Sequence, residues 1–234
     1  MADFVLVHGA WHGAWCWKKI LPGLWSAGHR AFPVTLTGTG ERAHQLSRDI
    51  TLRTHADDVA AVIEAEELQQ AIVVGHSYGG MVITAVADRM PDRIARLVYL
   101  DAVVPLPGES WSSTHAEQTR MQRRQAIAST GCIPPADPAM FGLAGEDAAW
   151  VLRRQTPQAG GVYDDPLDFD PARVAALPRT FIDCNAPALA TIAVMRARVR
   201  EQPGWDVHEI ATGHDAMISA PQELLRLLLE MAKA

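Results

Sequence analysis

The residues Gly75-His76-Ser77-Tyr78-Gly79 form the pentapeptide G-x-S-x-G. They follow the apolar run Ala71–Val74 and open a stretch with helical periodicity, Gly79–Arg89. A strand–turn–helix context of this kind is typical of a nucleophile elbow, a sharp turn that exposes a serine hydroxyl for attack on a carbonyl carbon. Side chains at the two glycines would collide with the neighbouring helix and strand. We therefore predict that Ser77 is a catalytic nucleophile; the alternative is a tight turn with no catalytic role.

A serine hydroxyl is a weak nucleophile and needs a general base. In sheets that carry this elbow, the histidine follows the serine and the acid along the chain. His208 falls inside the predicted strand Trp205–Ile210, whereas His214 lies in the loop between that strand and the terminal helix. This loop opens at the same sheet edge as the elbow. We predict that His214 is the base; the alternative is a histidine in a surface loop.

An oxyanion hole requires two backbone N–H donors that point at the developing negative charge. The residue after the nucleophile, Tyr78, is expected to supply one of them. The segment His8-Gly9-Ala10-Trp11 is a glycine-containing loop after an early apolar run, and it is suited to supply the other. The predicted donors are thus the N–H groups of Ala10 and Tyr78.

The pair His8 and His12 also has a spacing that could hold a metal on one helix face. Gly9 and Gly13 make a helix there unfavourable. Catalytic zinc normally takes three protein ligands, and no third ligand cluster is evident. We therefore expect neither a metal nor another cofactor.

The elements that must position these residues alternate between strand and helix, which predicts an α/β fold. Short runs that are apolar throughout indicate strands buried on both faces of a mostly parallel sheet. Helical periodicity is clear in 52–63, 79–89 and 221–231. The six predicted strands are Phe4–Val7, Arg30–Leu36, Ala71–Val74, Ile94–Leu100, Arg179–Cys184 and Trp205–Ile210.

The segment 105–178 interrupts this alternation, because it is rich in proline, glycine and polar residues. It still contains two helix-like stretches, His115–Ser129 and Glu146–Arg154. A structureless loop of this length is rare within a compact domain. We expect a helical cap at 105–178, inserted into a core that comprises 1–104 and 179–234.

The composition excludes several classes of protein. Hydrophobic residues make up 48 % of the 234 residues and charged residues 21 %, which argues against intrinsic disorder. No apolar run approaches the ~20 residues of a membrane-spanning helix. The net charge of −6 offers no general attraction for nucleic acid or anionic lipid. Three separated cysteines and a first segment without a basic region predict a cytoplasmic protein, and a homodimer is compatible with the sequence.

Three motifs together resemble the α/β-hydrolase superfamily: His8-Gly9-Ala10-Trp11-His12-Gly13-Ala14-Trp15, Gly75-His76-Ser77-Tyr78-Gly79-Gly80 and Gly213-His214-Asp215. More narrowly, they resemble the branch of plant methylesterases and hydroxynitrile lyases, with bacterial relatives that hydrolyse pyrethroid- and carbendazim-type compounds. The resemblance runs across both halves of the predicted sheet and does not extend to the cap. It implies an α/β-hydrolase fold with a serine nucleophile.

Two positions distinguish the chain from the lyases of that branch. The lyases are similar but carry a threonine where Gly9 stands and a lysine directly after the histidine, where this chain has Asp215. A carboxylate beside the base would repel departing cyanide, whereas a lysine would stabilise it. These differences favour ester hydrolysis.

The acid of the triad has two candidates in the sequence. In this family it usually lies just past the strand that we place at Arg179–Cys184, but the segment Asn185–Leu189 contains no acid. Asp183 lies earlier, within the strand. Asp101 ends the strand Ile94–Leu100, a position where some α/β-hydrolases carry their acid. We favour Asp101 over Asp183; a histidine supported only by water and an Asp101 that merely braces the cap hinge are the alternatives.

The resemblance and the residues favour a serine carboxylesterase that acts on small, uncharged, hydrophobic or aryl esters. A mostly apolar pocket suits such substrates. A hydroxynitrile lyase and a non-catalytic ligand-binding receptor on the same fold are the competing hypotheses. Candidate lining residues in the cap are Trp111, Met121, Met140, Phe141 and Trp150.

Overall fold

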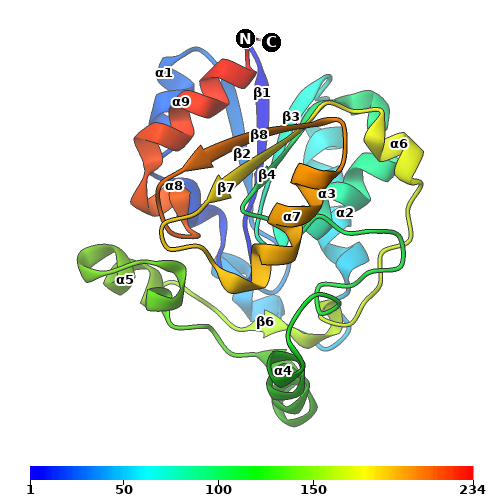
Figure 1. Ribbon diagram of the computed structural model, residues 1–234, viewed down its shortest axis with the longest axis vertical. Helices are drawn as coiled ribbons and strands as arrows, with labels where there is room; N and C mark the ends of the chain where they lie inside the picture. The colour runs from blue at the N-terminus through cyan, green and yellow to red at the C-terminus, as the bar shows by residue number, and fades with distance from the viewer. Residues whose placement is uncertain (234) are drawn as a thin grey trace.

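A central sheet of six parallel strands organises the protein, as the computed structural model of residues 1–233 shows (Figure 1). The strand order is β2-β1-β3-β4-β7-β8, with β3, the strand before Ser77, near the centre. This arrangement confirms the predicted α/β-hydrolase fold class. The strands are β1 (Asp3–Val7), β2 (Arg30–Val34), β3 (Ala71–His76), β4 (Ile94–Leu100), β7 (Arg179–Cys184) and β8 (Trp205–Ile210).

The central strands are apolar on both faces because helices cover the sheet on both sides. All six residues of β3 are buried, whereas the edge strand β2 is mostly part-exposed. β2 tolerates Pro33, which cannot donate a ladder hydrogen bond, because one side of an edge strand has no partner. β2 ends two residues before the predicted boundary, and β3 extends to His76, the residue directly before Ser77.

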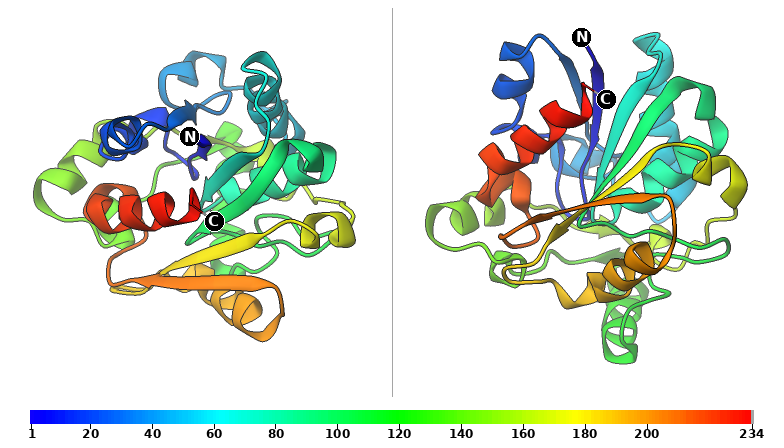
Figure 2. Two further views of the ribbon diagram at one scale, coloured as in Figure 1. Left: turned by 90° about the horizontal axis from the view of Figure 1, so that it is seen from above. Right: turned by 45° about the horizontal axis from the view of Figure 1, so that its top comes forward.

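The helices form two layers around the sheet (Figure 2). α2 and α3 pack together on one face, while α1 and α9 lie on the other. Among the described residues, no helix combines the length and the apolar character needed to cross a bilayer. These core helices are α1 (Leu21–Ser26), α2 (Leu52–Ala65), α3 (Gly79–Arg89), α7 (Ala193–Glu201), α8 (Ala216–Ser219) and α9 (Pro221–Met231).

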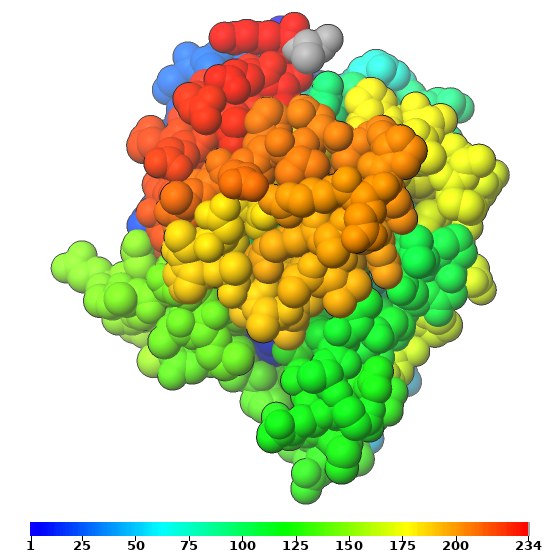
Figure 3. All heavy atoms as spheres, in the orientation of Figure 1, coloured from blue at the N-terminus to red at the C-terminus, as the bar shows by residue number. Residues whose placement is uncertain are grey.

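The segment between β4 and β7 covers the end of the sheet where the strands finish (Figures 1 and 3). The two predicted helices are present with shifted ends, as α4 (Glu117–Thr130) and α5 (Gly145–Leu152). α4 protrudes from the molecule, and none of its residues is fully buried. A two-stranded ribbon, β5 (Cys132–Ile133) with β6 (Gln158–Ala159), links the cap helices, and α6 (Pro171–Ala175) packs against α3.

Candidate active site

Ser77 occupies the sharp turn between β3 and α3. Its φ of 54° lies in the left-handed region, which is strained for a residue with a Cβ and typical of functional sites. A Cβ on Gly75 would lie 2.7 Å from the carbonyl oxygen of Gly79, and one on Gly79 would lie 2.9 Å from that of His8. The steric reason for both glycines is therefore confirmed. Ser77 is partly exposed, whereas the residues on either side of it are buried.

His214 and Asp101 meet at the edge of the sheet where the strands end. Nδ1 of His214 donates a hydrogen bond of 2.6 Å to Oδ2 of Asp101, and both side chains are buried. Asp101 directly follows β4 and has a φ of 41°. His76, next to Ser77, lies against His214: its Nε2 donates to the backbone oxygen of His214 at 3.1 Å. The structure thus brings Ser77, His214 and Asp101 to one edge.

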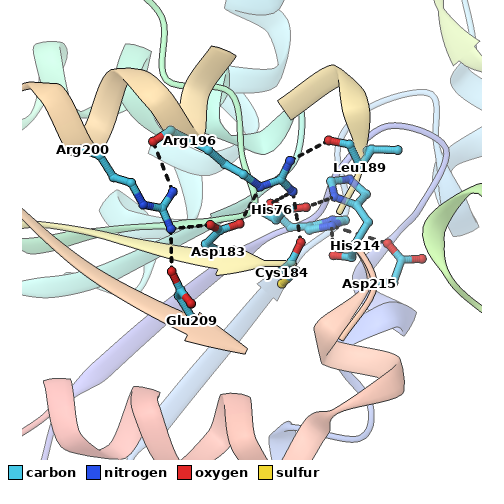
Figure 4. Close-up of polar contacts among 10 residues, drawn as sticks. His76, Asp183, Cys184, Leu189, Arg196, Arg200, Glu209, His214 and Asp215 are labelled. Atoms are coloured by element: carbon cyan, nitrogen blue, oxygen red, sulfur yellow. Dashed lines mark hydrogen bonds and ion pairs between the residues drawn. The ribbon is translucent and has the colours of Figure 1, made fainter. Parts of the chain in front are cut away.

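Asp183 faces away from the histidine and binds arginines instead (Figure 4). Its Oδ1 accepts from Nε of Arg196 at 2.5 Å, and its Oδ2 accepts from Arg200 at 2.6 Å. Arg196 also donates to Oδ1 of Asp101 at 2.7 Å. Sequence reasoning identified both aspartates but missed Arg196, because nothing in the local pattern of α7 marks this residue.

The two predicted oxyanion donors lie on neighbouring loops. Ala10 follows β1, and Tyr78 follows the serine; both residues are buried. Among residues 1–233, neither backbone N–H donates a hydrogen bond to a protein acceptor. Trp11, the residue after Ala10, has a φ of 66°, so strained backbone is found on each loop of the site.

The cap fastens the loop that contains Ala10 and Trp11. The backbone N–H of Trp11 donates to Oε1 of Gln158 at 3.3 Å, and its indole N–H donates to the backbone oxygen of Ile133 at 3.2 Å. The backbone N–H of Thr156 donates to the oxygen of Trp11 at 2.9 Å. The ribbon β5–β6 therefore holds one side of the site.

A second set of cap contacts reaches His214. The backbone N–H of His214 donates to the oxygen of Phe141 at 2.9 Å, and the two rings lie 5.6 Å apart. A Cβ on Gly213 would lie 2.2 Å from that same oxygen, so glycine is required beside the histidine. The cap thus contributes to the position of His214 as well as to the roof of the site.

The five candidate lining residues have different surroundings. Trp111 and Phe141 are buried beside Trp11, with ring centroids 5.9 and 6.1 Å from it. Trp150 packs edge-on against Trp15 at 5.0 Å. The expected lining role of Met121 and Met140 is not supported, because both side chains are more than 60 % exposed.

Arg123 of α4 lies over these rings and was not identified from the sequence. Its guanidinium carbon is 5.3 Å from the ring centre of Trp11, 4.8 Å from that of Trp111 and 5.5 Å from that of Tyr163. Burial lowers the pKa of Arg123. Stacking of this kind suits a planar guanidinium.

Asp215 forms a buried ion pair behind the site. Its Oδ2 accepts from Nε2 of His12 at 3.2 Å, and its Oδ1 lies 3.5 Å from Nε2 of His76. Burial favours neutral Asp215, but the charge and hydrogen bond of His12, together with His76 and His214, outweigh burial and lower the pKa of Asp215 to about 2. Burial also opposes a charge on His12, yet the carboxylate of Asp215 raises the pKa of His12. Asp215 is therefore already paired, which weakens the argument that it would repel departing cyanide.

The only residues grouped closely enough to suggest a metal, within 1–233, are His76, His214 and Asp215. Their potential ligand atoms lie within 4.8 Å of one another. A metal there would take a nitrogen of His214, so it would compete either with the Asp101 hydrogen bond or with the function of a general base. Residues 8–13 form no helix, and both ring nitrogens of His8 are bound to backbone groups.

Comparisons with known proteins agree with this architecture. The model of the alpha/beta hydrolase family matches residues 4–227. The carbendazim hydrolyzing esterase of Nocardioides sp. (strain SG-4G) is 40 % identical, over 97 % of this chain and 98 % of the relative. Methylesterase 3 of Arabidopsis thaliana is 28 % identical, over 97 % of this chain and 95 % of the relative.

A solved structure extends the likeness to the fold as a whole. An extracellular alpha/beta-hydrolase from a Paenibacillus species superposes with a TM-score of 0.85 at 22 % identity, and 98 % of each chain is covered. These alignments span the cap, where the motif resemblance ended. With a family match over nearly the whole chain and the serine turn, histidine loop and sheet in place, this chain belongs to the alpha/beta hydrolase family.

Proposed function

We propose that this protein is a serine carboxylesterase that hydrolyses small, uncharged, hydrophobic or aryl esters through an acyl-enzyme. The observation that carries the proposal is the hydrogen bond between Asp101 and His214 beside the strained Ser77 turn. The esterases among the relatives support the same reaction class. We assign Ser77 as nucleophile, His214 as base and Asp101 as acid.

The mechanism follows from these roles. Nε2 of His214 removes the proton from Ser77 as its Oγ attacks the ester carbonyl carbon. Asp101 accepts a hydrogen bond from the Nδ1–H of His214 and stabilises the imidazolium that forms when His214 takes the proton. The N–H groups of Ala10 and Tyr78 bind the carbonyl oxygen, which becomes negatively charged.

The tetrahedral intermediate then collapses. The bond to the alkoxy oxygen breaks as His214 returns the proton, so the alcohol leaves and the acyl group stays on Ser77. Water, deprotonated by the same histidine, attacks the acyl carbon in the second half-reaction. The carboxylic acid is released, and the hydroxyl of Ser77 is restored.

Gly9 supports hydrolysis over the lyase reaction. A Cβ at this position would lie 2.7 Å from Cβ of Ser77 and 2.8 Å from Nδ1 of His76. The threonine of the related lyases would therefore require the serine turn to move. No comparable observation favours a receptor without catalytic activity.

The aromatic residues Trp11, Trp111 and Phe141 support an apolar substrate, because their rings gather beside the oxyanion loop. We assign 105–178 as the cap that encloses the substrate and 1–104 with 179–234 as the catalytic core. Cys16, Cys132 and Cys184 are unpaired, which is compatible with a reducing compartment such as the cytoplasm.

A fluorophosphonate probe and p-nitrophenyl acetate test the proposal together. We expect the probe to label the wild-type protein at Ser77, the ester to be hydrolysed, and Ser77→Ala to lose both properties. Ser129→Ala, which changes an exposed serine of α4, serves as the control and should keep both. A wild-type protein that is neither labelled nor active on a panel of alkyl and aryl esters would exclude the esterase. Release of cyanide from mandelonitrile would favour the lyase.

A further inference from the structure

The guanidinium of Arg196 is held on several sides at once. Its Nη2 donates to Oδ1 of Asp101 at 2.7 Å and to the oxygen of Cys184 at 3.0 Å. Its Nη1 donates to the oxygen of Leu189 at 2.7 Å, and its Nε donates to Asp183 at 2.5 Å. Figure 4 shows the group between Asp183, Cys184 and Leu189. A planar fork with four hydrogen bonds has little freedom to rotate.

The carboxylate of Asp101 therefore lies between a histidine and an arginine. Oδ2 faces Nδ1 of His214, and Oδ1 faces Arg196. Asp101 is completely buried, so each oxygen needs a partner from the protein. Without Arg196, Oδ1 would lose its ion pair and the carboxyl group could turn away from the histidine.

The sheet itself explains why a cation is needed here. Leu100 of β4 pairs with Ile182 of β7, and the N–H of Asp101 donates to the oxygen of Ile182. The next residues on the two strands, Asp101 and Asp183, are consequently neighbours at the same edge. Two buried carboxylates side by side repel each other unless a positive charge lies between them.

An outer pair of residues completes the charge balance. Arg200 donates to both Asp183 and Glu209. Across the whole cluster, three carboxylates face two guanidinium groups, which leaves one negative charge. The imidazolium of His214 would balance that charge when the histidine holds a proton.

From this geometry we propose that Arg196 is a positioning residue for the triad acid, and that Asp183 anchors Arg196 and is not itself the acid. The arginine fixes the rotation of the Asp101 carboxylate so that Oδ2 meets the histidine. The inference rests on the proposed esterase function. It assigns the two candidate aspartates different roles within one network.

Three variants test this role by kinetics on p-nitrophenyl acetate. Arg196→Met should lower kcat by roughly 10- to 100-fold, with KM changed less than about threefold, because a misplaced acid affects the reaction more than ground-state binding. In a plot of kcat/KM against pH, the fall on the acidic side should move to higher pH in Arg196→Met. Without the arginine, no cation offsets the negative charge of Asp101 beside His214. Arg196→Lys keeps the positive charge but loses the planar guanidinium. Its pH profile of kcat/KM should therefore not shift, while kcat falls by a smaller factor than in Arg196→Met.

Arg200→Met is the matched control on the same helix. Arg200 shares Asp183 with Arg196 but, among the residues that the structure describes, forms no hydrogen bond or ion pair with Asp101. In Arg200→Met, kcat should stay within about twofold of the wild type, and the pH profile of kcat/KM should not shift. Thermal unfolding of every variant shows whether a loss of activity merely follows a loss of folded protein, and the lysine variant provides the test if the methionine variant does not fold.

A double-mutant cycle gives the decisive measurement. In the Asp101→Asn background, adding Arg196→Met should change the residual rate of fluorophosphonate labelling less than about twofold, because Arg196 acts through Asp101. An equal loss in both backgrounds, or wild-type kcat and pH profile in Arg196→Met, would overturn the positioning role. A wild-type protein that the probe does not label refutes the esterase itself, so the two failures are distinguishable.

Discussion

Nδ1 of His214 donates a 2.6 Å hydrogen bond to Oδ2 of Asp101, although the two residues are 113 positions apart. Asp101 comes from the end of β4, next to the strand β3 that precedes Ser77, and His214 comes from the loop after β8. The ends of parallel strands meet at one edge of the sheet, which is where α/β proteins place their functional groups. Through this contact His214 has a carboxylate partner, although the loop after β7 contains no acidic residue.

The two aspartates should differ strongly in their effect on turnover. Asp101→Asn should reduce kcat by up to ~10⁴, the factor observed when the aspartate of a serine protease triad is replaced in the same way. Asp183→Asn should cost less than about tenfold, because this residue acts only through Arg196. Steady-state kinetics with p-nitrophenyl acetate makes the comparison. Equal, small losses in both variants would contradict the assignment of the acid.

Gly9→Ala should damage the serine turn. The added methyl group would lie 2.7 Å from Cβ of Ser77, closer than such atoms approach in proteins. We expect kcat/KM to fall by at least about tenfold, because small displacements of reacting groups are costly. Gly28→Ala serves as the comparison for backbone strain without a clash, since a Cβ there meets no atom within 4 Å but φ is +81°. Unchanged esterase activity in Gly9→Ala would show that the turn can accommodate a side chain.

Buried neutral histidines should make the protein sensitive to acid. Nε2 of His55 donates to the oxygen of Thr37, and its Nδ1 accepts from the hydroxyl of Tyr78, an arrangement that requires the neutral ring. Burial lowers the pKa of His55 to about 4 and that of His8 to about 3. Between these values and the unfolded value near 6.5, the unfolded state binds more protons, so stability falls as the pH falls.

The size of this effect follows from the shift. His55 alone should remove about 3 kcal/mol of unfolding free energy between pH 6.5 and pH 4, at roughly 1.4 kcal/mol per pH unit. Urea denaturation at a series of pH values measures it. In His55→Gln the decline should be shallower by about this amount, although the variant is less stable near neutral pH. Parallel pH curves for the two proteins would argue against a neutral His55.

Breaking the ion pair behind the site should destabilise the fold. In Asp215→Asn, His12 loses the carboxylate that raises its pKa, and a buried polar group is left poorly paired. Removing one partner of a buried pair typically costs about 3–5 kcal/mol. The double variant His12→Gln/Asp215→Asn should be less destabilised than the sum of the two single variants. Additive losses in urea denaturation would mean that the two residues do not interact.

The glycine-flanked turn at Ser77 and the positions of the six strands along the chain could be predicted from the sequence because they depend on local patterns. An apolar run, two glycines and a periodic helix are neighbours along the chain, and their steric consequences are short-range. The loop position of His214 follows from the same reasoning, since the strand before it and the helix after it have clear patterns. The lining role of the two methionines could not be judged from local patterns. Met121 lies on the protruding helix α4 and Met140 in the short 3-10 helix Pro138–Phe141, and neither pattern tells which side chains the fold covers.

The sequence by itself determined the fold, the candidate nucleophile and the candidate base. Only the tertiary structure decided between the two aspartates, because β4 and β7 pair in a register that places both at one edge and α7 then brings Arg196 between them. The partner of Asp215 likewise could not be predicted from the sequence, since His12 lies 203 positions away and only the folded sheet brings the two residues together. Such charge pairings depend on distances in space, which spacing along the chain does not encode.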